Sequence, residues 1–442
     1  MKRALIYLGF SVFILGLIIS YDVTKYDGNV IMRPLINAFS DDADIDYSDG
    51  YEGFVAEEVA PAKSDNDKNK DVTKNVADNK QDDMVVEEQE LDEDIEEDDS
   101  FTAQKDPSRG FEYYFTLLSD EEKKVYNVMY EAFSNVESGN AIPTLDEATM
   151  NKVAGYLRMD HPEFFYLESM GYTHYTKGGV IQKTVISAKY SDSKAGIKVD
   201  RENMDRVADQ IIASFPPGAD DYTKVKMTYE WIINNTDYVK DSKDNQNMKS
   251  VLLYHQSVCA GYAKALQYVL NKAGVPTIYV DGRSLISGEN HAWNMCFVNG
   301  EYYYVDATWG DASYTANGYS GAEPKAAINY DYLLVTTEEI ERTHAMASDL
   351  ILPMCRAVED NYYIREGLYL WGYDYDTIAQ MFSNAYASGR RQVEFKCANL
   401  EIYDEVRKNL ITNSGVFDFI QGDSSTISYV EDEEQRTLCF WL

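Results

Sequence analysis

The chain has 442 residues, of which 75 are Asp or Glu and 40 are Lys or Arg, so its formal net charge is −35. This acidic balance argues against a nucleic-acid partner, because binding to phosphate backbones depends on clustered Lys and Arg and the sequence has no basic stripe. A chain of this length has room for about two or three folded domains.

The N-terminus begins with basic residues and continues into an apolar stretch. Residues 4–21 are uncharged and mostly apolar, and as a helix they would span about 27 Å, close to the thickness of a bilayer's hydrocarbon core. Small residues are missing at the spacing that a signal peptidase prefers, which favours an uncleaved anchor over a signal peptide. We therefore assign residues 1–22 to a membrane anchor or signal peptide. The remaining chain is expected to lie outside the cell membrane or to be secreted.

A strongly acidic segment follows. Residues 41–100 hold 24 Asp or Glu and five Lys, a net charge of −19. Such a segment cannot bury enough apolar surface to offset its chain entropy, and its charges repel one another. We assign residues 23–106 to an acidic disordered linker.

The next stretch combines helix and strand signals. Residues 119–122 and 144–147 match capping boxes that open two helices. Strand-like runs at 172–190 surround a Lys-Gly-Gly turn, and a helix near 201–214 is ended by two prolines. Residues 107–216 are therefore predicted to form an α+β accessory domain.

A cysteine stands where a further helix is predicted to begin. After Cys259, apolar residues at 262, 265, 266, 269 and 270 recur at helical spacing, and Gly274 and Pro276 supply a stop. The unpaired amide groups and the dipole at a helix start favour an anion, so we expect the thiolate form of Cys259 to be accessible near neutral pH. The same amide groups could hold an oxyanion.

The residues after this helix predict a β-hairpin. Asn299-Gly300 lies between two aromatic and β-branched runs, which is the strongest short-range hairpin signal. If these are the two turn residues, His291 and Asp306 lie on one face as diagonal neighbours, within side-chain reach. Thr308 would lie opposite His291 and brace it by hydrogen bonding.

Cys259, His291 and Asp306 together have the order and residue types of a nucleophile, a base and an orienting carboxylate. We expect Asp306 to accept the proton on Nδ1 of His291, which would leave Nε2 to face the sulfur. Each residue taken singly also has a non-catalytic interpretation. The cysteine could be a small buried hydrophobic residue, the histidine a core or surface group, and the aspartate the end of a strand.

These motifs resemble those of the transglutaminase-like superfamily. The resemblance covers about residues 222–312, most clearly at Val258-Cys259-Ala260-Gly261-Tyr262-Ala263, His291-Ala292-Trp293-Asn294 and Tyr304-Val305-Asp306-Ala307-Thr308-Trp309. It extends more loosely to residue 350, where a Leu-Leu-Val-Thr strand and His344 precede Pro353. It implies an α+β, papain-like core in which a helix carrying the cysteine packs on an antiparallel sheet carrying the histidine and aspartate. It also implies that Cys259 is the nucleophile, His291 the general base and acid, and Asp306 the orienter. The superfamily includes cross-linking enzymes, peptidases, amide hydrolases and inactive relatives, so the fold does not name the substrate.

We assign residues 217–350 to this core and residues 351–442 to a small C-terminal α+β domain. In the latter, a helix is expected near 376–388, ended by Gly389, with strands near 391–397 and 426–441.

Other residues are candidates for supporting roles. Gln256 and Tyr238 are candidates for donating to the oxyanion or lining the cleft, although a solvated loop position and a packing role fit them too. Trp293 and Trp309 are expected to wall the cleft and exclude water. No cofactor or metal is assigned, because His255 near Cys259 has neither a His-Glu-x-x-His motif nor paired Cys-x-x-Cys beside it.

Two functional hypotheses remain. The first is a cell-surface thiol enzyme, acting on peptide or side-chain amides as a peptidase, an amidase or a protein cross-linker. The second is a catalytically idle binding or assembly module of the cell envelope. The expected partners are a protein or peptide substrate and, through residues 4–21, the membrane. The sequence leaves open the acyl donor and acceptor, the oligomeric state and the pairing of the four other cysteines.

Overall fold

The computed structural model describes residues 7–8, 19–22, 31–33, 84–91, 101–311, 328–422 and 426–442. The chain divides into two units, one of Gly53–Arg206 and one of Val207–Leu442 together with Met1–Glu52. The division falls within helix α3 (Lys194–Ala213). The domain limits given above stay predictions.

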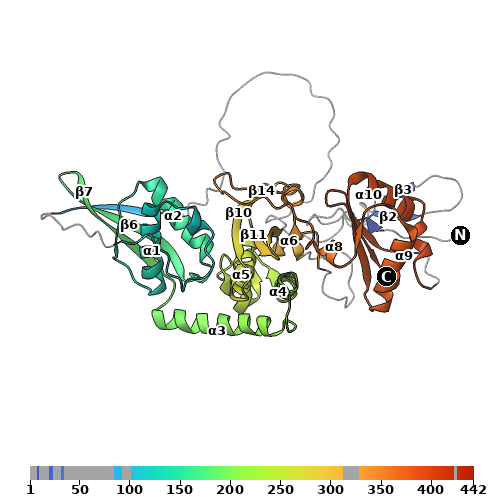
Figure 1. Cartoon of the computed structure of the whole chain (residues 1–442), viewed down its shortest axis with the longest axis horizontal. Coiled ribbons are helices and arrows are strands. Elements are labelled where there is room, and N and C mark those ends of the chain that lie inside the picture. The colour runs from blue at the N-terminus through green and yellow to red at the C-terminus, as the bar shows by residue number, and fades with distance from the viewer. Residues whose placement is uncertain are drawn as a thin grey trace, which may run out of the picture. The chain divides into compact units, whose positions relative to one another are not determined.

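The first unit is an α+β arrangement in which helices α1 and α2 accompany a four-stranded sheet of order β4-β6-β7-β5, and it also includes the start of α3 (Figure 1). Its elements are α1 (Asp120–Ser134), α2 (Glu147–Asp160), β4 (Val85–Glu90), β5 (Ala141–Ile142), β6 (Leu167–Lys177) and β7 (Val180–Tyr190). The predicted turn joins β6 to β7 through Gly178 and Gly179, whose φ angles are both positive.

The two predicted capping boxes have different outcomes. Ser119 and Glu122 form the capping box at the start of α1, which confirms the first. The second is wrong, because Asp146 caps α2 by accepting a hydrogen bond from the amide of Thr149. Thr144 instead shares a 2.6 Å hydroxyl hydrogen bond with Thr184.

Part of the acidic linker is ordered, which corrects its assignment as disordered throughout. Residues Val85–Glu90 form β4, which pairs in parallel with β6. The carboxylate of Glu90 accepts hydrogen bonds from the hydroxyl of Thr176 and the amide of Gly178. Backbone pairing and these contacts offset the charge repulsion that the composition suggested. Most other positions of residues 23–106 lie outside the described residues.

Most of the N-terminal helix expected over residues 4–21 falls outside the described residues. Among the residues described, no helix has the length and apolarity needed to cross a membrane. Short antiparallel strands occur at β1 (Tyr7–Leu8), β2 (Ile19–Asp22) and β3 (Ile31–Arg33). The other positions of the expected span lie outside the described residues.

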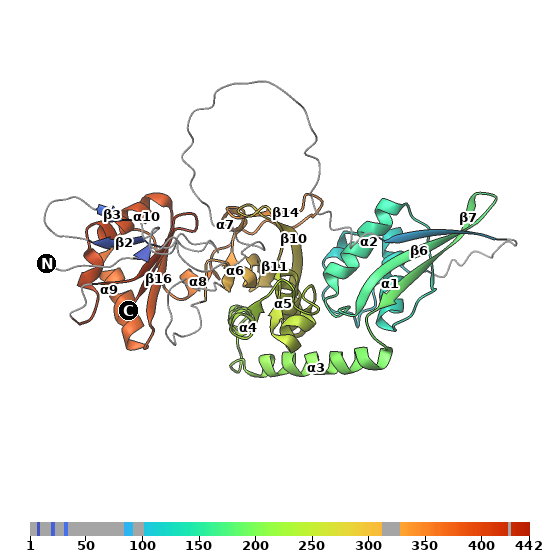
Figure 2. The same cartoon turned by 180° about the vertical axis from the view of Figure 1, so that it is seen from behind.

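The core of the second unit is a five-stranded antiparallel sheet of order β13-β12-β11-β10-β14. Helix α5 packs against β10 and β11, and α4 packs against α5 (Figures 1 and 2). The elements are α4 (Asp221–Asn235), α5 (Cys259–Lys272), β10 (Thr277–Ser284), β11 (Asn290–Val298), β12 (Glu301–Val305), β13 (Leu333–Val335) and β14 (His344–Met346). A helix carrying the cysteine and a sheet carrying the histidine are thus in the predicted arrangement.

The hairpin register follows the prediction up to its last residues. Asn299 and Gly300 both have positive φ, and pairing runs from Val298 with Glu301 to Asn294 with Val305. β12 then ends, and Asp306 becomes the N-cap of the short helix α6 (Ala307–Gly310). Thr308 therefore lies in α6 and is not the strand partner of His291, which corrects that expectation.

The C-terminal residues form a second sheet, of order β15-β16-β18-β17, with helices beside it. Its strands are β15 (Tyr369–Leu370), β16 (Gln392–Cys397), β17 (Tyr429–Asp432) and β18 (Thr437–Trp441), and the helices are α9 (Tyr375–Ala387) and α10 (Leu400–Arg407). Gly389 follows α9 with a φ of 68°, as its predicted role at the helix end requires. Helix α10 was not predicted. Shorter elements are β8 (Asp237–Tyr238), β9 (Gln256–Ser257), α7 (Thr337–Ile340) and α8 (Tyr362–Arg365).

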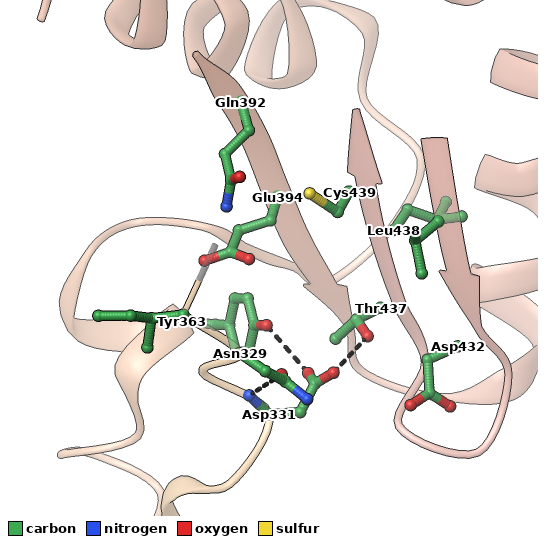
Figure 3. Close-up of a pocket in the computed structure, with 11 residues that line it drawn as sticks. Asn329, Asp331, Tyr363, Gln392, Glu394, Asp432, Thr437, Leu438 and Cys439 are labelled. Carbon is green, nitrogen blue, oxygen red and sulfur yellow. Dashed lines mark hydrogen bonds between the residues drawn. The ribbon is translucent and has the colours of Figure 1, made fainter. Parts of the chain in front are cut away.

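The C-terminal sheet meets the core around buried charged groups. Lys396 on β16 forms a 3.0 Å ion pair with Glu339 on α7. A small pocket nearby is lined by Asp331, Glu394 and Asp432, and Figure 3 shows Asp331 accepting hydrogen bonds from the hydroxyls of Tyr363 and Thr437. Burial, reinforced by the charge of Asp331, raises the pKa of both Glu394 and Asp432 to about 8.

Candidate active site

Cys259 is the first residue of α5 and is half-buried. The preceding residue, Val258, is extended and offers no side-chain cap to the helix. Because the first amide groups of a helix have no intrahelical partner, those beside the sulfur can be used by a ligand. Gly261 lets this turn pack closely, since a Cβ there would collide with the hydroxyls of Ser257 and Ser250.

His291 lies on β11 with only 8% of its surface exposed. Its Nε2 is 2.6 Å from Oδ2 of Asp306, and its imidazole also contacts the side chain of Cys259. Burial on its own would lower the pKa of His291, but the charge and hydrogen bond of Asp306, together with the contact with Cys259, raise it to about 10. The arrangement therefore favours an imidazolium beside the sulfur.

The ring of His291 has the opposite orientation to the one predicted. Nε2, not Nδ1, faces the carboxylate, so Nδ1 is the nitrogen left for Cys259. The prediction placed Asp306 on a continuing strand. Because the chain instead turns into α6 at Asp306, the carboxylate reaches the Nε2 side of the ring.

Asp306 is fully buried and accepts four hydrogen bonds. Its Oδ1 accepts from the backbone amides of Thr308, at 2.8 Å, and Trp309, at 3.1 Å. Its Oδ2 accepts from His291, at 2.6 Å, and from Nε2 of His344, at 2.9 Å. Burial would raise the pKa of Asp306, but these imidazoles hold it well below its usual range. The carboxylate is thus ionised and fixed in orientation.

His344, the first residue of β14, was not among the predicted site residues. It is 1% exposed, and its Nδ1 lies 2.8 Å from the hydroxyl of Thr343. The looser part of the resemblance includes His344 but gives it no role, because β14 reaches the site only by pairing with β10.

His291, Asp306 and His344 present ligating atoms within 4.8 Å of one another, a set that could hold a metal ion and that no sequence motif indicated. The separations of 2.6 and 2.9 Å are hydrogen-bond lengths. Two ligands on one tetrahedral metal ion would lie about 3.3 Å apart, given metal–ligand bonds of about 2.0 Å. As they stand, the three side chains form a hydrogen-bonded group.

The other candidates surround this group at different distances. Trp293 stacks on His291 with ring centres 5.7 Å apart, and Trp309 lies 5.8 Å from the same ring. Gln256 is exposed on β9, and Tyr238 lies on β8, where it pairs with Ser257 in the segment that leads into Cys259. The two tryptophans thus enclose the imidazole, while roles for Gln256 and Tyr238 stay predictions.

All five cysteines are free thiols. Burial raises the pKa of Cys296, Cys355 and Cys397 to about 12 each, and that of Cys439 also lies well above its usual range. These four therefore lack the setting of a reactive thiol. Cys259 alone lies at a helix start beside an imidazole.

Comparison with known proteins identifies a family that part of this core matches. Residues 207–307 match the family model described as the transglutaminase-like superfamily. Residues 207–307 of this chain belong to that superfamily. Within it, the match ends one residue after Asp306 and includes Cys259 and His291.

Individual relatives share only parts of the chain. The kyphoscoliosis peptidase of Mus musculus is 31% identical over 105 residues, which cover 20% of this chain and 16% of that protein. A solved structure of a TGase is 13% identical with a TM-score of 0.23, covering 39% of this chain and 67% of that one. The periplasmic domain of TgpA from Pseudomonas aeruginosa is 16% identical with a TM-score of 0.20, covering 29% and 55%. This chain thus spans about one sixth of the length of its curated relative.

Proposed function

We propose that this protein is a cysteine-dependent acyl-transfer enzyme that acts on peptide or side-chain amides. The observation that carries the proposal is the meeting of Cys259, His291 and Asp306, with the sulfur at the start of α5 and the carboxylate behind the imidazole. An imidazolium next to a thiol at a helix start stabilises the thiolate, which is the nucleophilic form.

The proposed reaction has two stages. The sulfur of Cys259 attacks the amide carbon, and the carbonyl electrons move to the oxygen, which the first amide groups of α5 can stabilise. The proton on Nδ1 of His291 passes to the leaving nitrogen as the carbon–nitrogen bond breaks, which leaves a thioester. Water or an amine then gives a proton to Nδ1 and attacks the thioester carbon. The carbon–sulfur bond breaks, which releases the acyl group and restores the thiolate of Cys259 beside the imidazolium of His291.

The test is turnover of an unstructured protein such as casein, with and without a fluorescent primary amine. We expect cleavage or amine incorporation by the wild-type protein and its loss in Cys259→Ala and His291→Ala. Cys355→Ala is the matched control, because it removes a buried thiol away from these groups and should keep turnover. The relative is named a peptidase, which makes peptide bonds the first substrate to try. No turnover together with an unreactive Cys259 would instead favour the binding module.

We also propose that the enzyme works outside the cell membrane. The support is the basic start and the apolar residues 4–21 of the sequence. Labelling of intact cells with a membrane-impermeant lysine reagent should modify the protein, and labelling only after lysis would contradict this placement.

A further inference from the structure

Two imidazoles share one oxygen of Asp306. Nε2 of His291 lies 2.6 Å and Nε2 of His344 lies 2.9 Å from Oδ2, while Oδ1 is occupied by two backbone amides. All three side chains are at least nine-tenths buried. The proposed reaction uses His291 and Asp306 but gives no task to His344.

The proton positions on His344 follow from its surroundings. Burial lowers the pKa of His344, and the charge on His291 adds to this, although Asp306 opposes both. The ring is therefore neutral at neutral pH and carries one proton. A carboxylate can only accept, so that proton lies on Nε2, and Nδ1 accepts from the hydroxyl of Thr343 at 2.8 Å.

Among the described residues, few titratable groups lie close to His344. They are Asp306, His291 at a ring separation of 5.2 Å, and Tyr332 at 5.7 Å. Trp293 and Trp309 cover the ring at 4.9 and 4.4 Å. Burial keeps the pKa of Tyr332 well above its usual range, so this phenol stays neutral. Asp306 and His291 are thus the charged groups to which His344 responds.

We propose that His344 is a positioning residue for the thiol reaction, which holds Oδ2 of Asp306 in line with His291 and limits how strongly that carboxylate retains the imidazolium proton. The inference rests on the proposed function. One N–H donor on a shared oxygen withdraws negative charge from the other, so His344 weakens the hold of Asp306 on His291. His344 thereby sets the alkaline limit of the reaction.

Two substitutions separate donation from packing. His344→Gln places an amide N–H the same number of bonds from the backbone as Nε2, whereas His344→Leu fills the space without a donor. The readouts are the rate of Cys259 alkylation and of amide turnover across pH, with thermal unfolding of each variant as the check on folding. Hydrogen-bond partners that orient the metal-binding histidines of metalloenzymes typically contribute about 10- to 100-fold, and we expect an effect of similar size here.

We expect His344→Leu to lose at least about tenfold in turnover. We also expect the alkaline limb of its pH–rate profile, where turnover falls as pH rises, to move to higher pH, because Asp306 then holds the proton on His291 more strongly. His344→Gln should stay near wild type in both. If the Leu variant does not fold, Thr343→Val, which removes the hydroxyl facing Nδ1, should move the limb in the same direction.

Several results would overturn the inference. A folded Leu variant with wild-type turnover and an unmoved limb would do so, as would a Gln variant that behaves like Leu. If His344→Leu does not fold, an unmoved alkaline limb in Thr343→Val would also overturn the inference. If wild-type Cys259 itself reacts as an ordinary thiol, the proposed function fails first, and this inference fails with it.

Discussion

At the residue scale, the site depends on how completely Asp306 is satisfied. Its oxygens accept two backbone amides and two imidazoles, and it also caps α6. In Asp306→Asn one of these oxygens becomes an amide nitrogen, which can no longer accept from its donors. We expect turnover to fall at least about 100-fold. The free energy of unfolding should drop by about 1–3 kcal/mol, because buried donors are left unpaired.

Steady-state turnover and urea unfolding check this prediction. Asp374→Asn is the control, because Asp374 caps α9 through Thr377 and Asn is an equally good cap. It should leave both quantities unchanged. Wild-type turnover in Asp306→Asn would contradict the role given to the carboxylate.

Residue types revealed part of this site from sequence. Cys259, His291 and Asp306 stand in recognisable motifs, so their proximity could be predicted. The nitrogen that His291 turns to Asp306 could not, because it depends on where the chain leaves β12. His344 was missed for a similar reason, since its contact with Asp306 is made across the sheet.

At the element scale, the site requires α5 and β11 to keep their separation. Asn294 on β11 donates to the carbonyl of Ala263 on α5, one turn from Cys259, at 3.0 Å. It also donates to the carbonyl of Ile278 on β10, at 3.3 Å. We expect Asn294→Ala to lower the free energy of unfolding by about 1–2 kcal/mol and, in addition, to slow alkylation of Cys259.

A matched control lies at the other end of the same helix. Asn271 accepts from the amide of Thr277 at 2.8 Å and so ties the end of α5 to β10. Asn271→Ala should lose a similar free energy of unfolding but leave the alkylation rate near wild type. Equal alkylation rates in the two variants would contradict a specific role for Asn294.

Helices and strands that are marked by residues nearby in the sequence could be predicted, whereas those that depend on pairing with distant residues could not. The Asn-Gly turn fixed the register of β11 and β12, and apolar spacing indicated α5. Strand β4 was not expected, because it pairs with β6, which lies far along the chain, and half of its own residues are acidic. Such pairing is decided by tertiary contacts rather than by composition.

At the scale of the whole molecule, stability should depend on the acidic pocket where the C-terminal sheet meets the core. Glu394 and Asp432 have pKa values of about 8 in the folded chain, compared with 4.5 and 3.8 for ordinary carboxyl groups. The folded state therefore binds more protons than the unfolded state between these limits. The free energy of unfolding should fall as pH rises from about 4.5 to 8 and lose no more from these groups above that.

Urea unfolding at about pH 5.5 and 8.5 measures this slope. We expect the wild-type free energy of unfolding to be lower at the higher pH by at least about 1 kcal/mol, since one pKa unit corresponds to about 1.4 kcal/mol. Glu394→Gln with Asp432→Asn should reduce the slope. His291 also has a raised pKa, so it contributes its own loss in the free energy of unfolding as pH rises. This loss, which is smaller than that from the two carboxyl groups together, should persist in the double variant. An unchanged slope would show that these carboxyls are not protonated in the fold.

The most direct measurement of the central claim is the rate at which iodoacetamide alkylates each cysteine across pH, read by peptide mass spectrometry. The four other thiols serve as internal references within the same molecule. We predict that Cys259 reacts well below about pH 8.5, where a free thiol ionises, and that His291→Ala abolishes this reactivity. If Cys259 reacts only as the pH approaches the pKa of an ordinary thiol, and does so with or without His291, the imidazole does not activate the sulfur and the account is wrong.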